Sequence, residues 1–253
     1  MTVTVVVAPH PDDEVLGASA VLLGREAIVV HVTDGVPPWT DTAARAATAA
    51  TRRAECRRAW AALACTAELA PLGFGDLTAW RSVEEIAAAL CAVVGPLGPA
   101  EVYVPAYQRG HPDHDATSLA ASLARDHLGG DATTWWAYAL YGYDRARSLR
   151  FGWLPRDMYG TVDERAGGDV LEAKARALRR FTSQLWPGSA LDSWLRAPVA
   201  EQFAPLPTTG AQPADLPFFY DEALGFGRYG ASAAEVEATF ARTLAARAEG
   251  RRP

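Results

Sequence analysis

Two short polar segments of the sequence combine histidines with carboxylates at a spacing suited to metal chemistry. The first segment, residues 10–14, reads His-Pro-Asp-Asp-Glu and follows the apolar run Val3–Val7. The second, residues 111–115, reads His-Pro-Asp-His-Asp and follows the apolar residues 102–105. Each apolar run has the composition of a buried strand, so each polar segment lies beyond a strand end. Parallel strands bring their carboxyl ends to one edge of a sheet, and we therefore expect both segments to meet at a single site.

Three side chains of these segments satisfy the needs of a catalytic metal centre. Such a centre takes three protein ligands from histidine or carboxylate side chains and leaves one position for water, whose pKa falls to about 7. His10, Asp13 and His114 provide these ligands. His10 and Asp13 lie three positions apart at a predicted helix entrance, a spacing at which both can reach one ion. These ligand types suit Zn²⁺ and also Fe²⁺, Mn²⁺ and Co²⁺.

The other residues of the two segments could move the protons of a hydrolysis. We expect Asp12 to lie beside the metal and to act as a general base that accepts a proton from bound water. His111 would lie on the opposite side of the substrate, where Asp113 could hold its second ring nitrogen and favour its protonated form. Such a histidine stabilises a developing oxyanion, so the set predicts hydrolysis of an amide. Glu14 is left to support the helix entrance or the ligand shell.

The carboxylates of residues 12–14 also have a simpler structural interpretation. Acidic residues are common in the first turn of a helix, where they interact favourably with the helix dipole. For either polar segment alone, this explanation is as good as a catalytic one. It weakens when two segments both follow strands and both carry histidines, and we therefore favour the metal centre.

The two segments are positioned by an alternation of short apolar runs with longer stretches rich in Ala, Leu and Arg. Strands are predicted over 3–8, 27–33, 68–72, 102–105 and 135–140, and helices from about 13 and over 43–64, 83–94 and 115–128. Alternating strands and helices are typical of a parallel sheet with right-handed crossovers. We therefore predict an α/β fold of Rossmann-like type, with a doubly wound and mostly parallel sheet.

The regular alternation stops after the first 141 residues, where Gly, Pro, Trp and Tyr become frequent. We expect one domain over residues 1–253, with an α/β core over 1–141 and a loop-rich, partly helical elaboration over 142–253 that forms the substrate pocket. Helices are predicted there over 170–184, 193–203 and 232–248, and a linker or lid over 205–217. Ser232 and Glu235 form a capping-box pattern at the start of the last helix.

Composition excludes several classes of function. The 253-residue chain has a formal net charge of −6 and no global basic pattern, which argues against nucleic acid as a partner. No apolar run is long enough to span a bilayer, and the three cysteines lack zinc-finger spacing. No Gly-x-Gly-x-x-Gly motif follows the first strand, which disfavours a dinucleotide cofactor. We expect a cytoplasmic protein that acts on a small-molecule substrate and does not bind membranes, while homo-oligomerisation stays open.

The two polar segments resemble the hallmark motifs of the PIG-L/LmbE-like family of zinc-dependent N-deacetylases. That family carries His-Pro-Asp-Asp-Glu after its first strand and a later His-Pro-Asp-His, and residues 10–14 and 111–114 match both motifs in full. Further matches are Thr33-Asp34-Gly35, Arg52 with Glu55, and the stretch from Lys174 to Gln184. The resemblance covers about the first 185 residues.

This resemblance implies both a reaction and a set of roles. The implied roles are zinc ligation by His10, Asp13 and His114, general base catalysis by Asp12, and electrophilic assistance by His111, oriented by Asp113. The implied substrate is an N-acetylated amino sugar or a related small amide, cleaved to a free amine and acetate. Candidate substrate contacts are Arg52, Asp76, Arg109 and Asp34. Arg109 stands where some sugar deacetylases carry a tyrosine.

Two alternatives remain beside the deacetylase. The same machinery could cleave a larger acyl amide, such as a thiol conjugate or a secondary metabolite, and the aromatic, Pro-rich C-terminal third leaves room for one. Among the loop aromatics, Tyr143 and Trp153 are candidates for stacking on a sugar ring or an aglycone. The second alternative, a non-catalytic sugar- or metal-binding module, would have lost the base, yet Asp12 is present.

Overall fold

The strands predicted from the apolar runs form the parallel part of one sheet in the computed structural model, which describes residues 3–129, 132–165, 167–207, 216 and 232–248. These strands are β1 (Thr4–Ala8), β2 (Glu26–Thr33), β3 (Thr66–Phe74), β4 (Glu101–Pro105) and β5 (Thr134–Tyr138). Two short antiparallel strands, β8 (Asp163–Arg165) and β9 (Glu201–Pro205), extend the sheet to the order β3-β2-β1-β4-β5-β9-β8. The predicted α/β fold with a mostly parallel sheet is confirmed.

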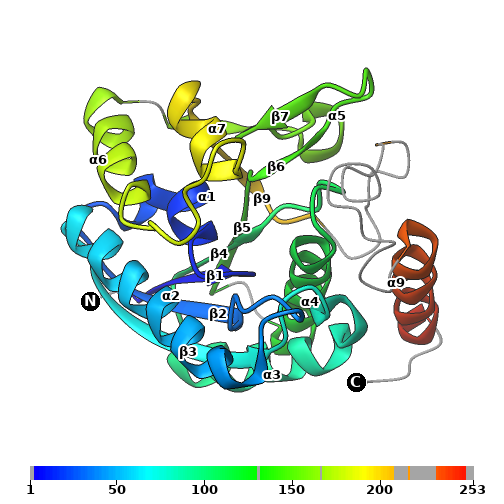
Figure 1. The fold of residues 1–253 in the computed structure, drawn as a ribbon. Helices are drawn as coiled ribbons and strands as arrows, with labels where there is room; N and C mark the ends of the chain where they lie inside the picture. The colour runs from blue at the N-terminus through cyan, green and yellow to red at the C-terminus, as the bar shows by residue number, and fades with distance from the viewer. Residues whose placement is uncertain (1–2, 130–131, 166, 208–215, 217–231, 249–253) are drawn as a thin grey trace.

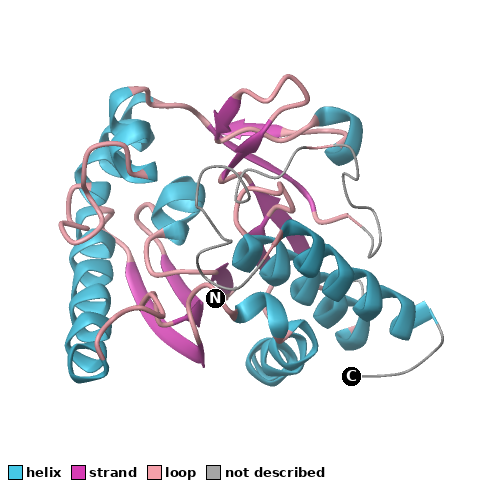
Figure 2. Cartoon of the chain, turned by 45° about the vertical axis from the view of Figure 1, so that its right-hand side comes forward, coloured by secondary structure: helices cyan, strands magenta, loops and turns pink. Residues whose placement is uncertain are grey.

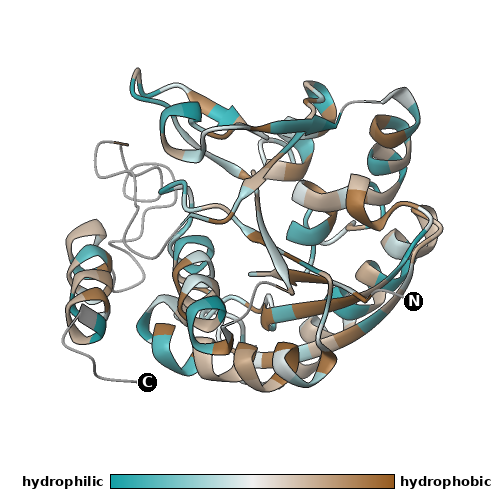
Figure 3. Ribbon diagram, turned by 180° about the vertical axis from the view of Figure 1, so that it is seen from behind, coloured by the Kyte–Doolittle hydropathy of each residue, from teal (hydrophilic) through white to brown (hydrophobic). Residues whose placement is uncertain are grey.

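Helices cover both faces of this sheet (Figures 1 and 2). One face packs against α3 (Val83–Leu97), α4 (Pro112–Leu128), α9 (Ala233–Ala248) and the 3-10 turn η1 (Ala79–Arg81). The other face packs against α1 (Asp13–Leu22), α2 (Thr42–Ala62), α6 (Gly168–Leu178) and α7 (Ala190–Arg196). The central strands are the most hydrophobic part of the ribbon in Figure 3, as expected for parallel strands that are buried on both faces.

A reversal of strand order brings the two polar segments together. β1 pairs with β2 on one side and with β4 on the other, and all three strands are parallel. Residues 10–14 follow β1, and residues 111–115 follow β4 after a short loop, so both segments leave the carboxyl edge of adjacent strands. Such switch points form the ligand-binding crevices of open α/β sheets. The predicted meeting of the two segments therefore follows from the topology.

The C-terminal third contains more sheet than the sequence predicts. The helix predicted over 193–203 is confirmed only as far as Arg196, where α7 ends, and its extension to 203 is wrong because β9 pairs with β5. Phe203 and Ala204 are fully buried at this pairing. Burial against a distant strand overrides local propensity, and no local pattern reveals it. A hairpin of β6 (Tyr141–Tyr143) and β7 (Leu149–Phe151), together with the short helix α5 (Arg156–Tyr159), occupies part of the region predicted as loops.

The last helix begins as predicted, with a capping box. The Glu235 backbone N–H donates to Ser232 Oγ at 3.3 Å, and the Ser232 N–H donates to Glu235 Oε2 at 2.7 Å. Of the linker or lid predicted over 205–217, Pro205 ends β9, while residues 208–215 and 217 lie outside the described part of the chain. None of the described helices combines the length and the hydropathy that crossing a membrane requires.

Candidate metal centre

The three predicted metal ligands converge on one point. His10 Nδ1 lies 3.0 Å from Asp13 Oδ2, and His114 Nε2 lies 3.2 Å from each of these two atoms. A tetrahedral centre with bonds of about 2.1 Å places its ligand atoms about 3.4 Å apart. The triangle formed by two imidazole nitrogens and one carboxylate oxygen therefore has the size and the chemistry of a divalent-metal site.

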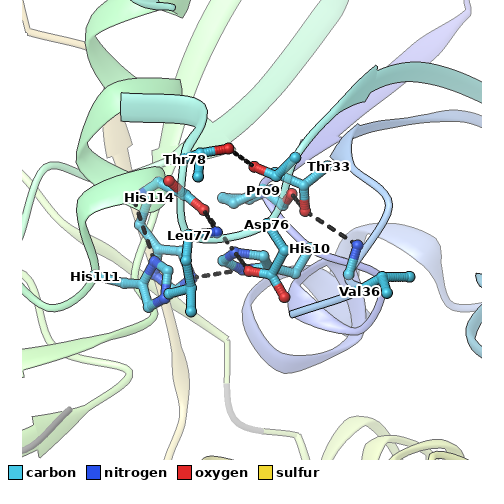
Figure 4. A network of polar contacts seen from close by, with 12 residues as sticks. Pro9, His10, Thr33, Val36, Asp76, Leu77, Thr78, His111 and His114 are labelled. Atoms are coloured by element: carbon cyan, nitrogen blue, oxygen red, sulfur yellow. Dashed lines mark hydrogen bonds and ion pairs between the residues drawn. The ribbon is translucent and has the colours of Figure 1, made fainter. Parts of the chain in front are cut away.

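Local structure explains why these side chains meet. The Asp13 N–H donates to the His10 carbonyl oxygen at 3.2 Å, and the His10 N–H donates to Asp13 Oδ2 at 3.0 Å, which closes a tight turn between β1 and α1. His114 lies in the first turn of α4, which begins at Pro112, a residue whose fixed φ suits that position. All three ligands are buried. In Figure 4 the rings of His10, His111 and His114 lie close together at the ends of their elements.

Two carboxylates hold the far side of the His10 ring. His10 Nε2 lies 3.2 Å from Asp76 Oδ1 and 3.3 Å from Asp113 Oδ2. Asp113 in turn accepts hydrogen bonds from the backbone N–H groups of Leu77, at 2.6 Å, and Trp80, at 3.3 Å. Carboxylates on the second nitrogen of a metal-ligating histidine fix its orientation and raise its basicity. Asp76, predicted as a substrate contact, thus contacts the predicted metal ligand His10 and also lines the cavity described below.

The role predicted for Asp113 needs correction. Its carboxylate contacts His10, and only its backbone N–H reaches His111, donating to Nδ1 at 3.2 Å. His111 is the N-cap residue of α4, so its Nδ1 is occupied as an acceptor and its ring proton lies on Nε2. Burial, together with His10 and His114, lowers the pKa of His111 well below its usual value. The structure therefore presents His111 as a neutral ring, not as the protonated form that the sequence predicts.

Asp12 lies beside the triangle in a strained conformation. Residues other than glycine rarely adopt its backbone φ of 141°. Such backbone strain is typical of functional sites. Asp12 Oδ2 accepts a hydrogen bond from Arg52 Nη2 at 3.2 Å, and the same nitrogen donates to the Pro11 carbonyl oxygen at 2.6 Å. Burial raises the pKa of the Asp12 carboxyl to about 7, against the lowering effect of Arg52. A carboxylate with a pKa near 7 suits a general base at neutral pH.

Glu14 points away from the metal ligands and into the protein. It is fully buried, and its Oε1 accepts a hydrogen bond from Trp60 Nε1 at 2.9 Å. Its Oε2 accepts a hydrogen bond from the Asp12 N–H at 3.1 Å and lies 3.4 Å from His31 Nε2. Of the two roles that the sequence leaves open, the structure places Glu14 at the helix entrance, where it holds the strained Asp12 peptide.

The triangle forms the floor of a cavity of about 520 Å³. This volume falls within the range of about 300–1,000 Å³ that is usual for small-molecule sites. The polar residues lining it are His10, Asp12, Asp13, Arg52, Asp76, His111, His114, Gln184, Ser189 and Ser193. The apolar and aromatic residues lining it are Leu16, Pro37, Trp39, Leu77, Tyr141, Leu149, Phe151, Trp186 and Ala190. Arg52 and Asp76, predicted as substrate contacts, are both present.

The other two predicted substrate contacts are not among the described residues that line this cavity. Asp34 turns toward its own loop, where Oδ1 accepts a hydrogen bond from the Val36 N–H at 2.9 Å. Arg109 donates to the Leu216 carbonyl oxygen and to Glu237 Oε1, each at 2.7 Å, and so connects the second polar segment to α9. Both side chains are engaged within the protein. Their predicted substrate roles receive no support from the geometry.

The aromatic residues of the cavity also differ from those that the sequence suggests. Tyr143 and Trp153 are absent from the described lining, and Trp39 and Trp186 are present instead. Both tryptophans lie in irregular segments, one after β2 and one between α6 and α7. Such segments carry no periodicity, so the only available signal was the presence of a large apolar residue in a loop beyond the carboxyl edge.

Comparison with known proteins finds a matching family model over part of the chain and several solved structures with a similar fold. Residues 5–124 match the family model described as PIG-L: GlcNAc-PI de-N-acetylase. A search of curated proteins finds no match. Among solved structures, a deacetylase–teicoplanin complex from teicoplanin biosynthesis is 19% identical, with a TM-score of 0.58 over 81% of this chain and 98% of that one. The N,N'-diacetylchitobiose deacetylase from Pyrococcus horikoshii is 21% identical, with a TM-score of 0.57 over 76% and 73%. The A40926 pseudoaglycone deacetylase is 23% identical, with a TM-score of 0.58 over 81% and 96%.

Proposed function

The predicted resemblance to the PIG-L family is confirmed over residues 5–124, and from this premise we propose that the protein is a metal-dependent hydrolase that removes the N-acetyl group from an amino sugar or a sugar-containing small molecule. One observation carries the proposal. The His10, Asp13 and His114 ligand atoms form a triangle with edges of 3.0–3.2 Å on the floor of a cavity, with Asp12 beside it. The matched family and the structural neighbours named above are deacetylases.

The residues around the triangle have separate roles in the proposed reaction. When bound by His10, Asp13 and His114, a divalent ion such as Zn²⁺ supplies a Lewis acid and lowers the pKa of water. Asp12 accepts the proton of the attacking water, while Arg52 holds the Asp12 carboxylate in place. His111 donates a hydrogen bond from Nε2 to the oxyanion that develops on the carbonyl. A neutral donor suffices for this role, and it fits the position of His111 as an N-cap residue.

Zinc is our proposed metal, and the donor set supports it. Two neutral imidazoles and one carboxylate form one of the ligand sets of catalytic zinc sites, which keep a fourth position open. Fe²⁺ accepts the same ligands, and metal content under native conditions distinguishes the two ions. One structural neighbour is a zinc-inhibited form of teicoplanin deacetylase, so assays should span zinc from equimolar to excess.

Substitution of the base tests this proposal. We expect Asp12→Asn to lower kcat by about 10²- to 10⁴-fold, because the amide cannot accept the proton of water. Activity is measured as amine release from a panel of N-acetylated amino sugars and their glycosides, with metal content determined on the same samples. Asp34→Asn is the matched control, because its carboxylate lies outside the described cavity lining. Undiminished turnover by Asp12→Asn, or no amine release by the native protein across the panel, would contradict the proposal.

A further inference from the structure

The loop between β4 and α4, residues 106–111, carries His111 on a strained turn. Arg109 has a backbone φ of 54°, which residues other than glycine rarely adopt. The next residue, Gly110, passes so close to the Tyr141 carbonyl oxygen that a Cβ at this position would overlap with it. His111 follows as the N-cap residue of α4. Strain of this kind persists only where surrounding contacts hold it, so the position of His111 depends on what holds the turn.

Two side chains of this loop contact α9, the helix that packs beside α4 (Figure 1). Arg109 donates from Nη1 to the Leu216 carbonyl oxygen and from Nη2 to Glu237 Oε1, each at 2.7 Å. The Tyr107 ring packs edge to face against Phe240, with the ring centroids 6.1 Å apart. Glu237 and Phe240 lie three positions apart, a spacing that puts both on one face of α9. One face of this helix therefore holds two residues of the loop.

A second set of contacts holds the loop to the body of the protein. Gln108 accepts a hydrogen bond from the Leu140 N–H at 2.7 Å and donates to the Trp153 carbonyl oxygen at 2.6 Å. Asp115 Oδ1 accepts hydrogen bonds from the backbone N–H groups of Gln108, at 3.0 Å, and Arg109, at 3.1 Å. The strained turn is thus held by the body of the protein through residue 108 and by α9 through residues 107 and 109.

We propose that α9 positions the oxyanion donor: through Glu237 and Arg109 it fixes the turn that places His111 beside the rings of His10 and His114. Arg109 and Glu237 are then positioning residues that act through His111. This inference rests on the proposed function, in which His111 donates to the oxyanion. Such a donor works only at the right distance, since a misplacement of about 1 Å can lower a rate about 10²-fold. α9 lies outside the matched residues 5–124.

The structure separates this positioning role from a role in global stability. The Glu237 side chain is 47% exposed, and an ion pair with so exposed a partner contributes little to stability. Other contacts also hold α9 in place: Arg247 pairs with Asp126 of α4, and Phe240 is buried in the hydrophobic core. Loss of the pair between Arg109 and Glu237 should therefore leave α9 docked and the free energy of unfolding close to native, while the turn loses one of its supports.

Steady-state kinetics of the zinc-loaded protein test the role of the pair. We expect Arg109→Met and Glu237→Gln each to lower kcat about tenfold at unchanged KM and zinc content, because a misplaced donor weakens only the transition state. Arg109→Lys keeps a charged donor and should recover part of the loss. Arg247→Met is the matched control, because it removes an ion pair between α9 and α4 and should keep the native kcat. An equal loss in the control, or native kcat in both test variants, would refute the inference.

A double-variant cycle determines whether the effect passes through His111. If it does, Arg109→Met lowers kcat about tenfold in the native background and less than about twofold in the His111→Ala background. The four proteins are compared at a temperature at which thermal melting shows all of them to be folded. The same fold-loss in both backgrounds would show that Arg109 acts on another part of the site, and would refute the inference.

Amide hydrogen exchange separates this inference from the proposed function, because it needs no turnover. Backbone N–H groups within residues 106–115 report on the turn, since two of them donate to Asp115 and one donates to His111 Nδ1. We expect Glu237→Gln to raise the exchange rate of this peptide several-fold and Arg247→Met to leave it unchanged. Native exchange in Glu237→Gln would refute the inference and leave the deacetylase proposal in place. No amine release by the native protein would refute the deacetylase proposal, whereas faster exchange in Glu237→Gln would still show that α9 holds the turn.

Discussion

The fully buried carboxylate of Glu14 shows how one residue outside the ligand set can determine the geometry of a site. It connects Trp60, His31 and the peptide of Asp12, whose φ of 141° requires outside support. Without this acceptor, the buried donors around it lose their partner, and unsatisfied buried groups cost about 1–3 kcal/mol each. Glu14 accordingly positions Asp12, the proposed base.

We predict that Glu14→Ala lowers the free energy of unfolding by at least about 2 kcal/mol and also lowers kcat, because Asp12 loses its fixed orientation. Urea denaturation and steady-state kinetics measure the two effects. Trp60→Phe is the matched control that removes one donor and keeps the carboxylate, and we expect a loss of about 1 kcal/mol from it. A Glu14→Ala protein of native stability and activity would show that the Asp12 turn supports itself.

The corrected position of Asp113 leads to a second prediction. Because its carboxylate holds His10 Nε2, Asp113→Ala should weaken zinc binding by about 10- to 100-fold. Competition with a chromogenic chelator measures this affinity directly. Had Asp113 served only to orient His111, the same substitution would lower kcat and leave zinc affinity unchanged, so this outcome would restore the role expected from the sequence. Asp34→Ala provides a control that removes a carboxylate remote from the described ligands.

Helix α1, which carries Asp13, is interrupted at Ala18, and a buried ion pair contacts the backbone on both sides of the interruption. Ala18 departs from helical geometry, with φ −137° and ψ 27°. Beyond the break, Glu201 accepts hydrogen bonds from the N–H groups of Ser19, at 2.9 Å, and Ala20, at 2.8 Å. Lys174 Nζ lies 2.9 Å from Glu201 Oε1 and donates to the carbonyl oxygen of Leu16 at 2.5 Å. Helix α6 and strand β9 thus satisfy the backbone groups that the break exposes.

Breaking this pair should be costly. We predict that Lys174→Met lowers the free energy of unfolding by about 3–5 kcal/mol, because Glu201 then keeps a buried charge without its partner. Urea denaturation measures the change, and the double variant Lys174→Met, Glu201→Gln should recover part of it. The exposed pair of Arg196 and Asp192 is the control, and Arg196→Ala should leave the midpoint unchanged. A loss no larger than that of the control would show that water solvates Glu201.

Individual elements differ in how well local sequence predicts them. β1, β2 and β4 are predicted to within a few residues, since each is a buried parallel strand that reads as an apolar run. β9 is not predicted from local sequence, because its burial depends on pairing with β5, which lies more than sixty positions earlier in the chain. Local sequence does not predict the break in α1 either, because the residues that form hydrogen bonds with its exposed backbone groups come from α6 and β9.

In the molecule as a whole, the proposed metal site lies between the two halves of the parallel sheet. Its ligands follow β1 and β4, which flank the point where the strand order reverses. An ion that binds only the folded protein stabilises it by mass action, by about 4 kcal/mol at a free concentration a thousandfold above its Kd. Metal binding should therefore be visible in global stability as well as in activity.

We predict that chelator treatment abolishes amine release and lowers Tm by several degrees, and that equimolar Zn²⁺ restores both. Differential scanning calorimetry and the amine assay on the same samples provide the measurement. His114→Ala should abolish the zinc-dependent rise in Tm, because it removes one corner of the ligand triangle. If chelated and zinc-loaded protein melt at the same temperature, these residues do not hold a metal.

The residues that we propose for the reaction are predictable from the sequence. His10, Asp12, Asp13 and His114 follow strands that are recognisable by their apolar runs, and parallel pairing sends all strand ends to one edge. Their surroundings are known only from the folded chain, in which Asp113 contacts His10, Arg109 contacts α9, and Trp39 and Trp186 line the cavity. The physical reason is that ligand identity is a matter of residue type and strand order, whereas the direction of a loop side chain depends on contacts with segments far away in the chain. The hydrophobic periodicity of the sequence does not predict those contacts.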